Sequence, residues 1–290
     1  MELTDSRIGV IGLGLMGGSL ALDLLDQGMQ LSGVDSDPHT AELARQAGIT
    51  TVDINTALTG SDVLVLATPV RETLRLMETF RAEPPALELV IDLGSTKRQI
   101  VEAMDALPDD LSAIGGHPLC GKELSGFQQA QAGLFKGSRF VLTPSSRTTP
   151  AALAISEQLI DKLGAMPLHM DAARHDRLLG TASHLPYLLA MALTGTAESL
   201  GKEDAVIWDV VSSGFLSGSR LAASDLTMMI DILTTNRDMV LAALARAQTE
   251  FDQLSDLLQA GDEGALRGLL QPLQQRRSSL HVHKGIPHGA

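Results

Sequence analysis

Hydrophobic positions in the first half of the chain form short runs that are separated by segments with helical spacing. Four apolar runs predict buried strands, at residues 8–11, 31–34, 63–67 and 89–93. Between these runs, the spacing of apolar residues predicts helices, for example over residues 17–27 and 41–47. Because repeated strand–helix units join parallel strands through right-handed crossovers, we expect an α/β fold whose mostly parallel sheet is covered on both faces.

The pattern changes to long helices after residue 170. Three further strand candidates, at residues 112–114, 139–143 and 166–170, extend the sheet to this point. We therefore expect a sheet domain over residues 1–170 and an all-helical domain over residues 171–290. In the second domain, apolar residues recur at spacings of three, four and seven, which is typical of amphipathic helices. They are Leu226, Met229, Ile230, Leu233, Val240, Leu241, Leu244, Phe251, Leu254 and Leu258.

This apolar stripe also predicts where helices end. It divides near residues 234–236, and Gly261 is expected to stop a helix before Asp262 caps the next one. Pro272 is expected to kink or end that last helix, and the polar tail from residue 281 is expected to fray. The width of the stripe favours a homodimer formed through the helical domain, although closure of the chain's own core explains it equally well.

A glycine-rich turn connects the first predicted strand to the first helix. Gly12, Gly14 and Gly17 form the pattern G-x-G-x-x-G, which permits a tight turn, close approach of a pyrophosphate and close packing of helix on strand. Asp35 ends the second strand 18 positions later (35 − 17), near the spacing of about 20 expected for an acid that binds the adenosine ribose. A carboxylate there repels a 2′-phosphate, so NAD is preferred over NADP. The sequence predicts a Rossmann-like cofactor loop made of Gly12, Leu13, Gly14, Leu15, Met16 and Gly17.

Composition excludes several classes of partner. The 290 residues include 22 Lys and Arg against 35 Asp and Glu, and the net charge of −13 disfavours nucleic acid and anionic membrane surfaces. No apolar stretch approaches the roughly 20 residues that cross a bilayer. The acidic N-terminus is unlike a basic signal peptide, and the single cysteine, Cys120, fits a reducing compartment, so we expect a cytoplasmic protein. His281 and His283 have a metal-like spacing but lie in the tail, so we assign no metal.

Polar residues follow three of the predicted strands, at the edge where open parallel sheets bind ligands. Thr68 and Pro69 follow the third strand, and Ser95 and Lys97 follow the fourth. His117 lies in a glycine-rich segment that is expected to form a loop after the next strand. A histidine in that setting can take a proton near neutral pH. Each of these side chains also fits a structural role, such as capping a helix.

Five motifs, in this order and at these intervals, resemble those of the prephenate/arogenate dehydrogenase family of tyrosine biosynthesis. They are GLGLMGGS from Gly12, DLGSTK from Asp92, GGHPLCG from Gly115, SHLP from Ser183 and SSGFLSGSR from Ser212. The resemblance covers nearly the whole chain and implies an oxidative decarboxylation that uses NAD. In that reaction a hydride leaves the ring carbon bearing the 4-hydroxyl, and loss of CO₂ makes the ring aromatic.

The resemblance also implies roles for five residues. His117 matches the histidine that removes the hydroxyl proton as the hydride departs, and Ser95 matches the serine that orients it and reaches the hydroxyl and the nicotinamide. His184 matches a histidine that positions the substrate. Arg220 matches the arginine that binds a substrate carboxylate, a task suited to its planar fork of donors. Glu123 matches an acid near the pocket in some members, although a solvated loop acid fits equally well.

Two positions depart from the family pattern. Many members have an acid shortly before the carboxylate-binding arginine, whereas here Phe215 is followed by Leu216 and Ser217. The acid that would brace Arg220 is therefore missing from its usual place. Cys120 stands where alanine or phenylalanine is common, and we interpret it as a small packing residue.

Two other functions share part of this pattern. A β-hydroxyacid dehydrogenase also has the glycine fingerprint and the residues Asp92, Ser95 and Thr96, but it needs a lysine on the first long helix. That helix carries His175 and His184 instead. A non-catalytic redox sensor that binds NAD would need a partner-binding or DNA-binding surface, which neither the charge nor the composition provides.

Overall fold

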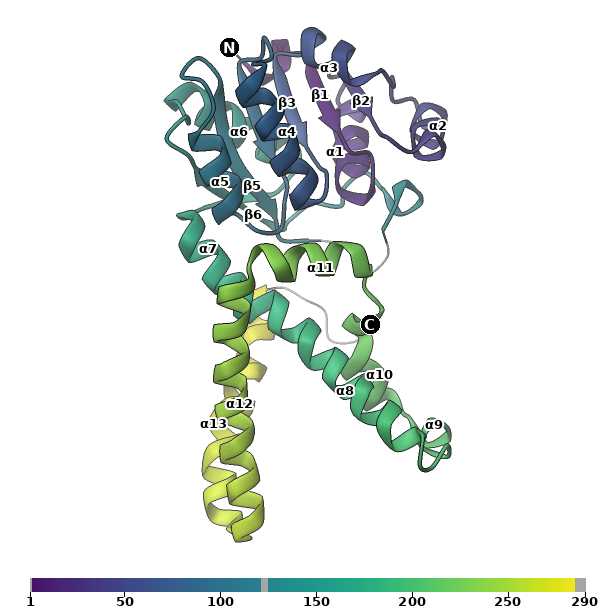
Figure 1. Ribbon diagram of the computed structural model, residues 1–290, viewed down its shortest axis with the longest axis vertical. Coiled ribbons are helices and arrows are strands. Elements are labelled where there is room, and N and C mark those ends of the chain that lie inside the picture. Colours follow the sequence, from purple (N-terminus) through teal and green to yellow (C-terminus); the bar gives the residue numbers. More distant parts are fainter. Residues whose placement is uncertain (1, 121–124, 285–290) are drawn as a thin grey trace. The chain divides into compact units, whose positions relative to one another are not determined.

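A seven-stranded sheet forms the centre of the first part of the chain (Figure 1). The computed structural model describes the backbone of residues 2–120 and 125–284, and their side chains up to residue 280. The strand order is β2-β1-β3-β4-β5-β6-β7, with β1 to β5 parallel, β6 antiparallel to β5, and β7 parallel to β6. The strands are β1 (Ile8–Ile11), β2 (Leu31–Val34), β3 (Val63–Leu66), β4 (Leu89–Asp92), β5 (Ser112–Pro118), β6 (Arg139–Pro144) and β7 (Met166–His169). The mostly parallel α/β fold expected from the apolar runs is confirmed.

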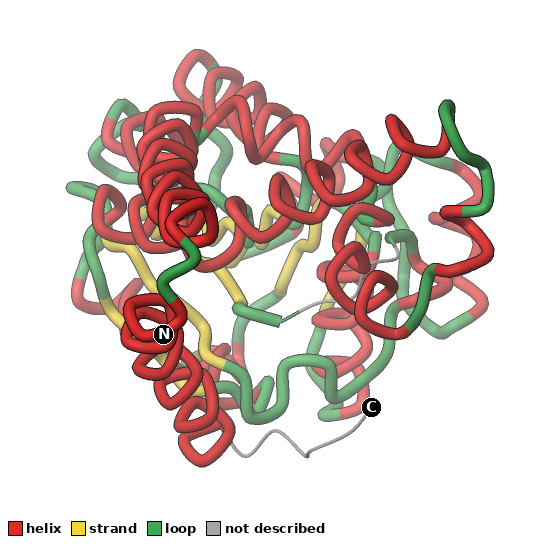
Figure 2. The backbone as a smooth tube through the Cα atoms, turned by 90° about the horizontal axis from the view of Figure 1, so that it is seen from below, coloured by secondary structure: helices red, strands yellow, loops and turns green. Residues whose placement is uncertain are grey.

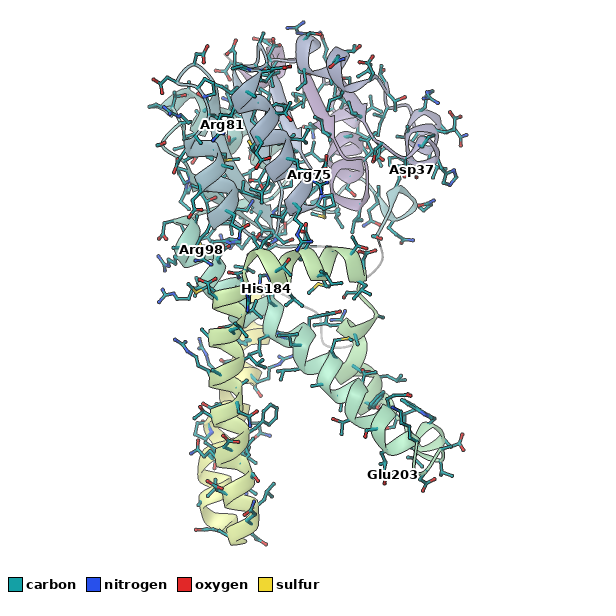
Figure 3. The ribbon with its side chains drawn as sticks, in the orientation of Figure 1. Asp37, Arg75, Arg81, Arg98, His184 and Glu203 are labelled. Atoms are coloured by element: carbon teal, nitrogen blue, oxygen red, sulfur yellow. The ribbon has the colours of Figure 1, made fainter. Side chains whose placement is uncertain are left out.

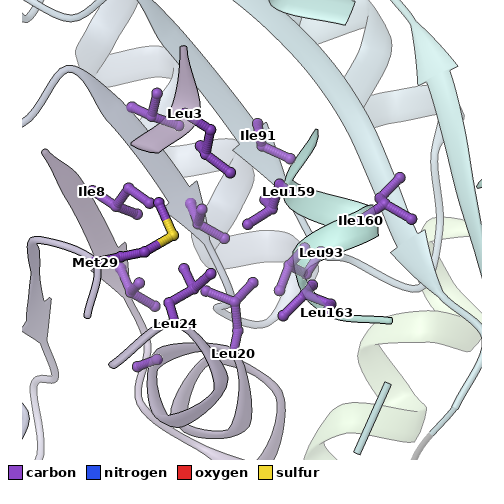
Figure 4. Packing of buried hydrophobic residues seen from close by; sticks show 14 of the residues in the cluster. Leu3, Ile8, Leu20, Leu24, Met29, Ile91, Leu93, Leu159, Ile160 and Leu163 are labelled. Carbon is purple, nitrogen blue, oxygen red and sulfur yellow. The ribbon is translucent and has the colours of Figure 1, made fainter. Parts of the chain in front are cut away.

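Helices cover both faces of this sheet because alternate strand residues point to opposite sides. Val63 and Val65 belong to one hydrophobic cluster, and Leu64 and Leu66 belong to the other. Leucines of α1 and α6 pack in the first cluster (Figure 4), and apolar residues of α4 and α5 pack in the second. The helices are α1 (Leu15–Asp26), α2 (Pro38–Gln46), α3 (Ile54–Gly60), α4 (Val70–Ala82), α5 (Arg98–Asp105) and α6 (Pro150–Lys162), with short 3-10 turns η1 (Leu3–Asp5) and η2 (Phe127–Gln129).

Strand β5 is longer than the sequence predicts. Gly115, Gly116 and His117 continue the strand and pair antiparallel with β6. A Cβ atom on Gly115 would lie 2.2 Å from Oγ1 of Thr143, and one on Gly116 would lie 2.5 Å from the carbonyl oxygen of Asp92. The glycines therefore allow close packing between strands, and the prediction of a glycine-rich loop around His117 is wrong because β6 returns alongside and supplies backbone partners.

Helices after β7 complete the first of two compact units, which spans Met1–Val240. Figure 2 distinguishes these helices, in red, from the strands, in yellow. Tyr187 of α8 packs with Met229 and Ile232 of α11 in a third, small cluster. The elements are α7 (Ala172–Leu179), a π-helical turn η3 (Gly180–His184), α8 (Leu185–Gly201), α9 (Ile207–Val210), α10 (Ser213–Ser219), η4 (Arg220–Ala223) and α11 (Leu226–Thr235).

The second compact unit, Leu241–Ala290, contains most of α12 (Arg237–Ala260) and all of α13 (Glu263–Lys284). The break between α11 and α12 falls at Asn236, as the stripe predicts. Gly261 has a φ of 64°, and Asp262 accepts a hydrogen bond from the backbone N–H of Ala265 at 2.9 Å, which confirms the predicted stop and cap. Pro272 lies inside α13 and does not end it. Of the tail, residues 285–290 lie outside the described residues. None of the described helices is both long and apolar enough to span a bilayer.

Candidate active site

The turn between β1 and α1 has the geometry that a bound dinucleotide requires. Gly12 has a φ of 91°, which favours glycine, and a Cβ on Gly17 would lie 1.9 Å from the carbonyl oxygen of Gly12. In contrast, no atom lies within 4 Å of a Cβ built on Gly14. Gly14 is also the N-cap of α1 and provides no side-chain cap, so the helix N-terminus and its positive dipole end stay open to an anion. The loop therefore fits a pyrophosphate.

Asp35 lies at the end of β2 beside this loop. Its Oδ2 accepts a hydrogen bond from the backbone N–H of Leu13 at 2.8 Å, and its Oδ1 accepts one from Asp37 at 2.9 Å. The side chains of Leu13 and Leu15 are buried, and Met16 packs against the first cluster. The loop residues between the glycines thus anchor the turn in the core, and Asp35 braces the turn through its backbone.

Thr68 and Pro69 lie where β3 ends, next to the glycine loop. Oγ1 of Thr68 is hydrogen-bonded to Oγ1 of Thr73 at 2.9 Å, and Pro69 is the N-cap residue of α4. A Cβ on Gly12 would touch both Ala67 and Thr68. The two predicted cofactor-binding segments are therefore neighbours at the carboxyl edge of the sheet, as expected for adjacent parallel strands.

A buried ion pair holds the ends of β4 and β5 together. Nζ of Lys97 donates to Oδ2 of Asp92 and, at 2.7 Å, to the carbonyl oxygen of Gly116. Asp92 in turn accepts hydrogen bonds from the backbone N–H groups of Gly94 and Gly116. Burial lowers the pKa of Lys97 and raises the pKa of Asp92. The attraction between the two charges has the opposite effect on each pKa, but burial is the larger cause. The pair fixes the loop that carries Ser95 next to the strand that carries His117.

His117 is half-buried on β5 and contacts a second histidine. Its Nδ1 lies 2.8 Å from Nε2 of His175, and the two rings meet edge to face with centroids 5.0 Å apart. Burial lowers the pKa of His117 well below its usual value, and the neighbouring His175, Lys97 and His184 lower it further. At neutral pH His117 is therefore an uncharged imidazole, which is the form that can accept a proton.

His175 and Asp176, both on α7, form hydrogen bonds that hold the site together. Nδ1 of His175 lies 2.8 Å from Oδ1 of Asp176, and both side chains are buried. Asp176 also accepts hydrogen bonds from the backbone N–H groups of Lys97, at 2.7 Å, and Arg98, at 2.9 Å. Burial raises the pKa of Asp176, but these hydrogen bonds outweigh it and the pKa lies below its usual value. Asp176 is therefore ionised at neutral pH.

His184 lies in the π-helical turn between α7 and α8 (Figure 3), and its side chain is buried. The amide nitrogen of Asn236 donates to the carbonyl oxygen of Asp176 at 2.8 Å and lies 3.2 Å from Nδ1 of His184. Nδ1 must then accept, which places the ring proton on Nε2. Among the described residues, Nε2 has no hydrogen-bond partner. Burial lowers the pKa of His184 to about 4, so the ring is a neutral donor at pH 7.

For Ser95, Arg220 and Glu123, the remaining predicted site residues, the structure shows less than for the histidines. Ser95 is half-buried in the loop after β4, and no hydrogen bond between its hydroxyl and His117 is present in the described part of the site. Arg220 is exposed and begins η4, which packs against α8, the helix that follows His184. Glu123 lies outside the described residues. The expected roles of these three residues remain predictions.

Sequence reasoning missed His175, Asp176 and Asn236 as members of the site. His175 and Asp176 follow an N-cap, Asp171, on an ordinary amphipathic helix, and nothing in their spacing indicates a contact with β5. One signal was present, because four charged or ionisable residues stand side by side in the segment ARHDRLL, so at least one of them must point to the buried face of the helix.

Two family models match consecutive parts of the chain. The nucleotide-binding domain of prephenate dehydrogenase matches residues 20–168, and the dimerization domain of prephenate dehydrogenase matches residues 171–272. Together these two matches cover most of the chain, and their common border lies next to β7.

Three known proteins resemble the chain over nearly its full length. Prephenate dehydrogenase of Lactococcus lactis is 29% identical over 96% of this chain and 78% of its own. A crystal structure of prephenate dehydrogenase from A. aeolicus in complex with hydroxyphenyl propionate and NAD⁺ has a TM-score of 0.87, with 26% identity over 97% of this chain and 98% of that one. Arogenate dehydrogenase of Synechocystis has a TM-score of 0.79, with 30% identity over 94% and 99% of the two chains.

Proposed function

Because the chain belongs to the prephenate dehydrogenase family, we propose that it oxidises prephenate, arogenate or both with NAD and releases CO₂. The substrate loses a hydride to NAD from the ring carbon that bears the hydroxyl, the hydroxyl passes its proton to the base, and cleavage of the bond to the ring carboxylate supplies the electrons that make the ring aromatic. The proton then returns to the phenolate oxygen, so that the products are a phenol, CO₂ and NADH. The β-hydroxyacid dehydrogenase alternative lacks its lysine: α8 carries none before its C-terminal Gly201. The sensor alternative leaves the buried histidines of the site unexplained.

The glycine loop and Asp35 would hold NAD. The open N-terminus of α1 suits the pyrophosphate, Gly14 gives it room, and Asp35 would accept hydrogen bonds from the ribose hydroxyls. The same carboxylate disfavours the 2′-phosphate of NADP. Thr68 and Pro69 would border the cofactor at the neighbouring strand end. When bound, NAD supplies the hydride acceptor.

His117 is the general base in this proposal. Its neutral ring takes the proton of the substrate hydroxyl, so that the departing hydride leaves a carbonyl rather than a cationic centre. Ser95, carried by the loop that Lys97 fixes, would orient the hydroxyl and contact the nicotinamide. Its role rests on the family resemblance and on its position at the end of β4.

His184, Arg220 and Glu123 would bind the substrate. His184 offers a buried N–H donor that has no partner in the described part of the chain, which suits a carboxylate or carbonyl oxygen of the substrate. Arg220 offers a guanidinium for a carboxylate. The two histidines would thus divide the work, because His117 accepts a proton and His184 donates a hydrogen bond.

We assign the sheet domain to residues 1–170 and the helical domain to residues 171–290. The border between the two family matches, after residue 168, supports this division. The match to a dimerization domain and the exposed apolar residues of the helices support a homodimer formed through the second domain.

One observation carries the proposed chemistry: a neutral histidine on the carboxyl side of the sheet, held through Nδ1, in a chain with a complete dinucleotide loop. The test is a set of parallel steady-state assays with prephenate and arogenate, each with NAD and NADP, in which NADH and CO₂ should form together. His117→Ala should lower kcat by about 10²- to 10⁴-fold, the usual loss when a general base is removed.

The affinity for NAD provides the control for this variant. It should change little in His117→Ala, because the cofactor loop belongs to β1 and α1. Absence of turnover with both substrates would refute the proposed reaction. Unchanged kcat in His117→Ala would remove the histidine from the mechanism while leaving the reaction itself intact.

A further inference from the structure

Three side chains form a hydrogen-bonded series that runs from the proposed base into the protein. Nδ1 of His117 contacts Nε2 of His175, and Nδ1 of His175 contacts Oδ1 of Asp176, each at 2.8 Å. His117 stands on β5, whereas the other two belong to α7. His175 and Asp176 are fully buried, so their contacts are made without competition from water.

The carboxylate of Asp176, at the end of the series, determines which nitrogen of each histidine carries a proton. An ionised carboxylate only accepts, so Nδ1 of His175 must carry a proton and donate to Asp176. Neutral His175 then has its lone pair on Nε2, which must accept from Nδ1 of His117. His117 is left with its lone pair on Nε2. The direction of both hydrogen bonds therefore follows from the charge of Asp176.

We propose that His175 and Asp176 are positioning residues that hold His117 in the tautomer whose Nε2 is free to accept the substrate's proton. This inference rests on the proposed function, because it concerns the base of that reaction. When Nε2 takes the proton, His117 becomes an imidazolium that still donates from Nδ1 to His175. No proton passes beyond His117, and the Asp176 carboxylate stabilises the new positive charge through the intervening neutral ring.

Asp176 is itself held in place by hydrogen bonds from the start of α5. It accepts from the backbone N–H groups of Lys97 and Arg98 and, at 3.4 Å, from Nε of Arg98. These residues begin α5, directly after the loop that carries Ser95. The series therefore connects α7 to both β5 and the β4 loop, and two backbone N–H groups help to fix its carboxylate end.

Protonation of His175 would reverse the direction of its hydrogen bond with His117. A doubly protonated His175 donates from Nε2 to Nδ1 of His117 and leaves the proton of His117 on Nε2, where the ring no longer acts as a base. The charged or titratable groups around the two rings are Asp92, Lys97, Asp176 and His184. Burial and the charge of Lys97 lower the pKa of His175 more than Asp176 and Asp92 raise it, so His175 is neutral at pH 7.

Nuclear magnetic resonance tests the proposal without any substrate. In protein labelled with ¹⁵N at its 8 histidines, long-range proton–nitrogen correlations distinguish the two neutral tautomers. His117 and His175 should both show a protonated Nδ1 at pH 7, and His184 should show a protonated Nε2. A wild-type His117 with its proton on Nε2 would overturn the proposal, and this measurement does not depend on any variant folding.

Two substitutions at one position separate hydrogen bonding from packing. His175→Leu removes the acceptor, so the proton of His117 should move largely to Nε2 and kcat should fall by about 10²-fold or more, with KM changed less than about threefold. His175→Gln places an amide oxygen near the former Nε2, because Asp176 attracts the amide NH₂. It should keep the wild-type tautomer and most of kcat.

Leu179→Ala, on the same helix, controls for lost packing. It should lower the melting temperature without changing the tautomer of His117. If His175→Gln loses as much kcat as His175→Leu, or if His175→Leu keeps the wild-type tautomer, the proposal fails. A protein that oxidises neither substrate but shows the expected tautomers would refute the proposed function and leave the hydrogen-bonded series standing.

Discussion

The two histidines nearest the proposed substrate carry their protons on opposite nitrogens, because different residues hold them. Asp176 acts through His175 and leaves Nε2 of His117 as an acceptor, whereas Asn236 donates to Nδ1 of His184 and leaves Nε2 as a donor. Both rings are neutral at pH 7, since burial lowers both pKa values. In the proposed mechanism, a single type of side chain would therefore provide a base and a hydrogen-bond donor in one site.

The buried His184 should make stability depend on pH. Its pKa is about 4 in the folded protein and about 6.5 when unfolded, so the unfolded chain binds more protons between these values. Stability should therefore be complete above pH 6.5 and decrease as the pH falls towards 4, by up to about 3 kcal/mol from this residue. Urea unfolding at several pH values measures this loss. His184→Gln should reduce the dependence on pH, and equal slopes in both proteins would contradict the assignment.

At the scale of elements, β5 shows how a strand can be longer than its apolar pattern. Only Ser112 to Ile114 have the composition of a buried strand, yet the glycines that follow pair with β6 and carry His117 into the site. α13 shows the opposite case, because Pro272 continues a helix that local rules would interrupt. In β5, pairing with β6 overrides the intrinsic preference of the segment.

Gly116→Ala should test how closely β5 must pack. The added methyl group would lie 2.5 Å from the carbonyl oxygen of Asp92 and 2.9 Å from the ring of Phe140, so backbone must shift. We expect a loss of about 1–3 kcal/mol in the free energy of unfolding and a lower kcat, because His117 is the next residue. Gly60→Ala, where a Cβ meets no atom within 4 Å, is the matched control and should be nearly neutral. Equal stability of the two variants in thermal unfolding would show that β5 tolerates the methyl group.

At the scale of the whole molecule, the helices leave many large apolar side chains exposed. Exposed apolar side chains of this kind are common where a chain binds another protein. The match to a dimerization domain makes a second copy of the chain the expected partner. The exposed residues on the described helices include Leu193, Leu200, Trp208, Val210, Leu216, Leu241, Leu244, Phe251 and Leu258.

The protein should therefore be a dimer, with about twice the chain mass of 30.7 kDa in light scattering. Replacing Phe251 and Leu258 of α12 with glutamate should shift it towards monomer, since these side chains are 53% and 66% exposed and would place charges in an apolar interface. Replacing Gln253 and Gln259 of the same helix with glutamate adds the same charge at polar positions and should leave the dimer intact. A monomeric wild-type protein would contradict the expectation.

The order of strands and helices, the cofactor loop and the caps of the last helices could be predicted from the sequence, because each depends on neighbours within a few residues. Gly12 and Asp262 act on residues next to them in the chain, and Asp35 contacts a loop that is only one strand–helix unit away. The partner of His117 could not be predicted this way. His175 lies 58 residues further along the chain and meets it only when α7 packs beside β5, so the tertiary structure alone decides which nitrogen carries the proton.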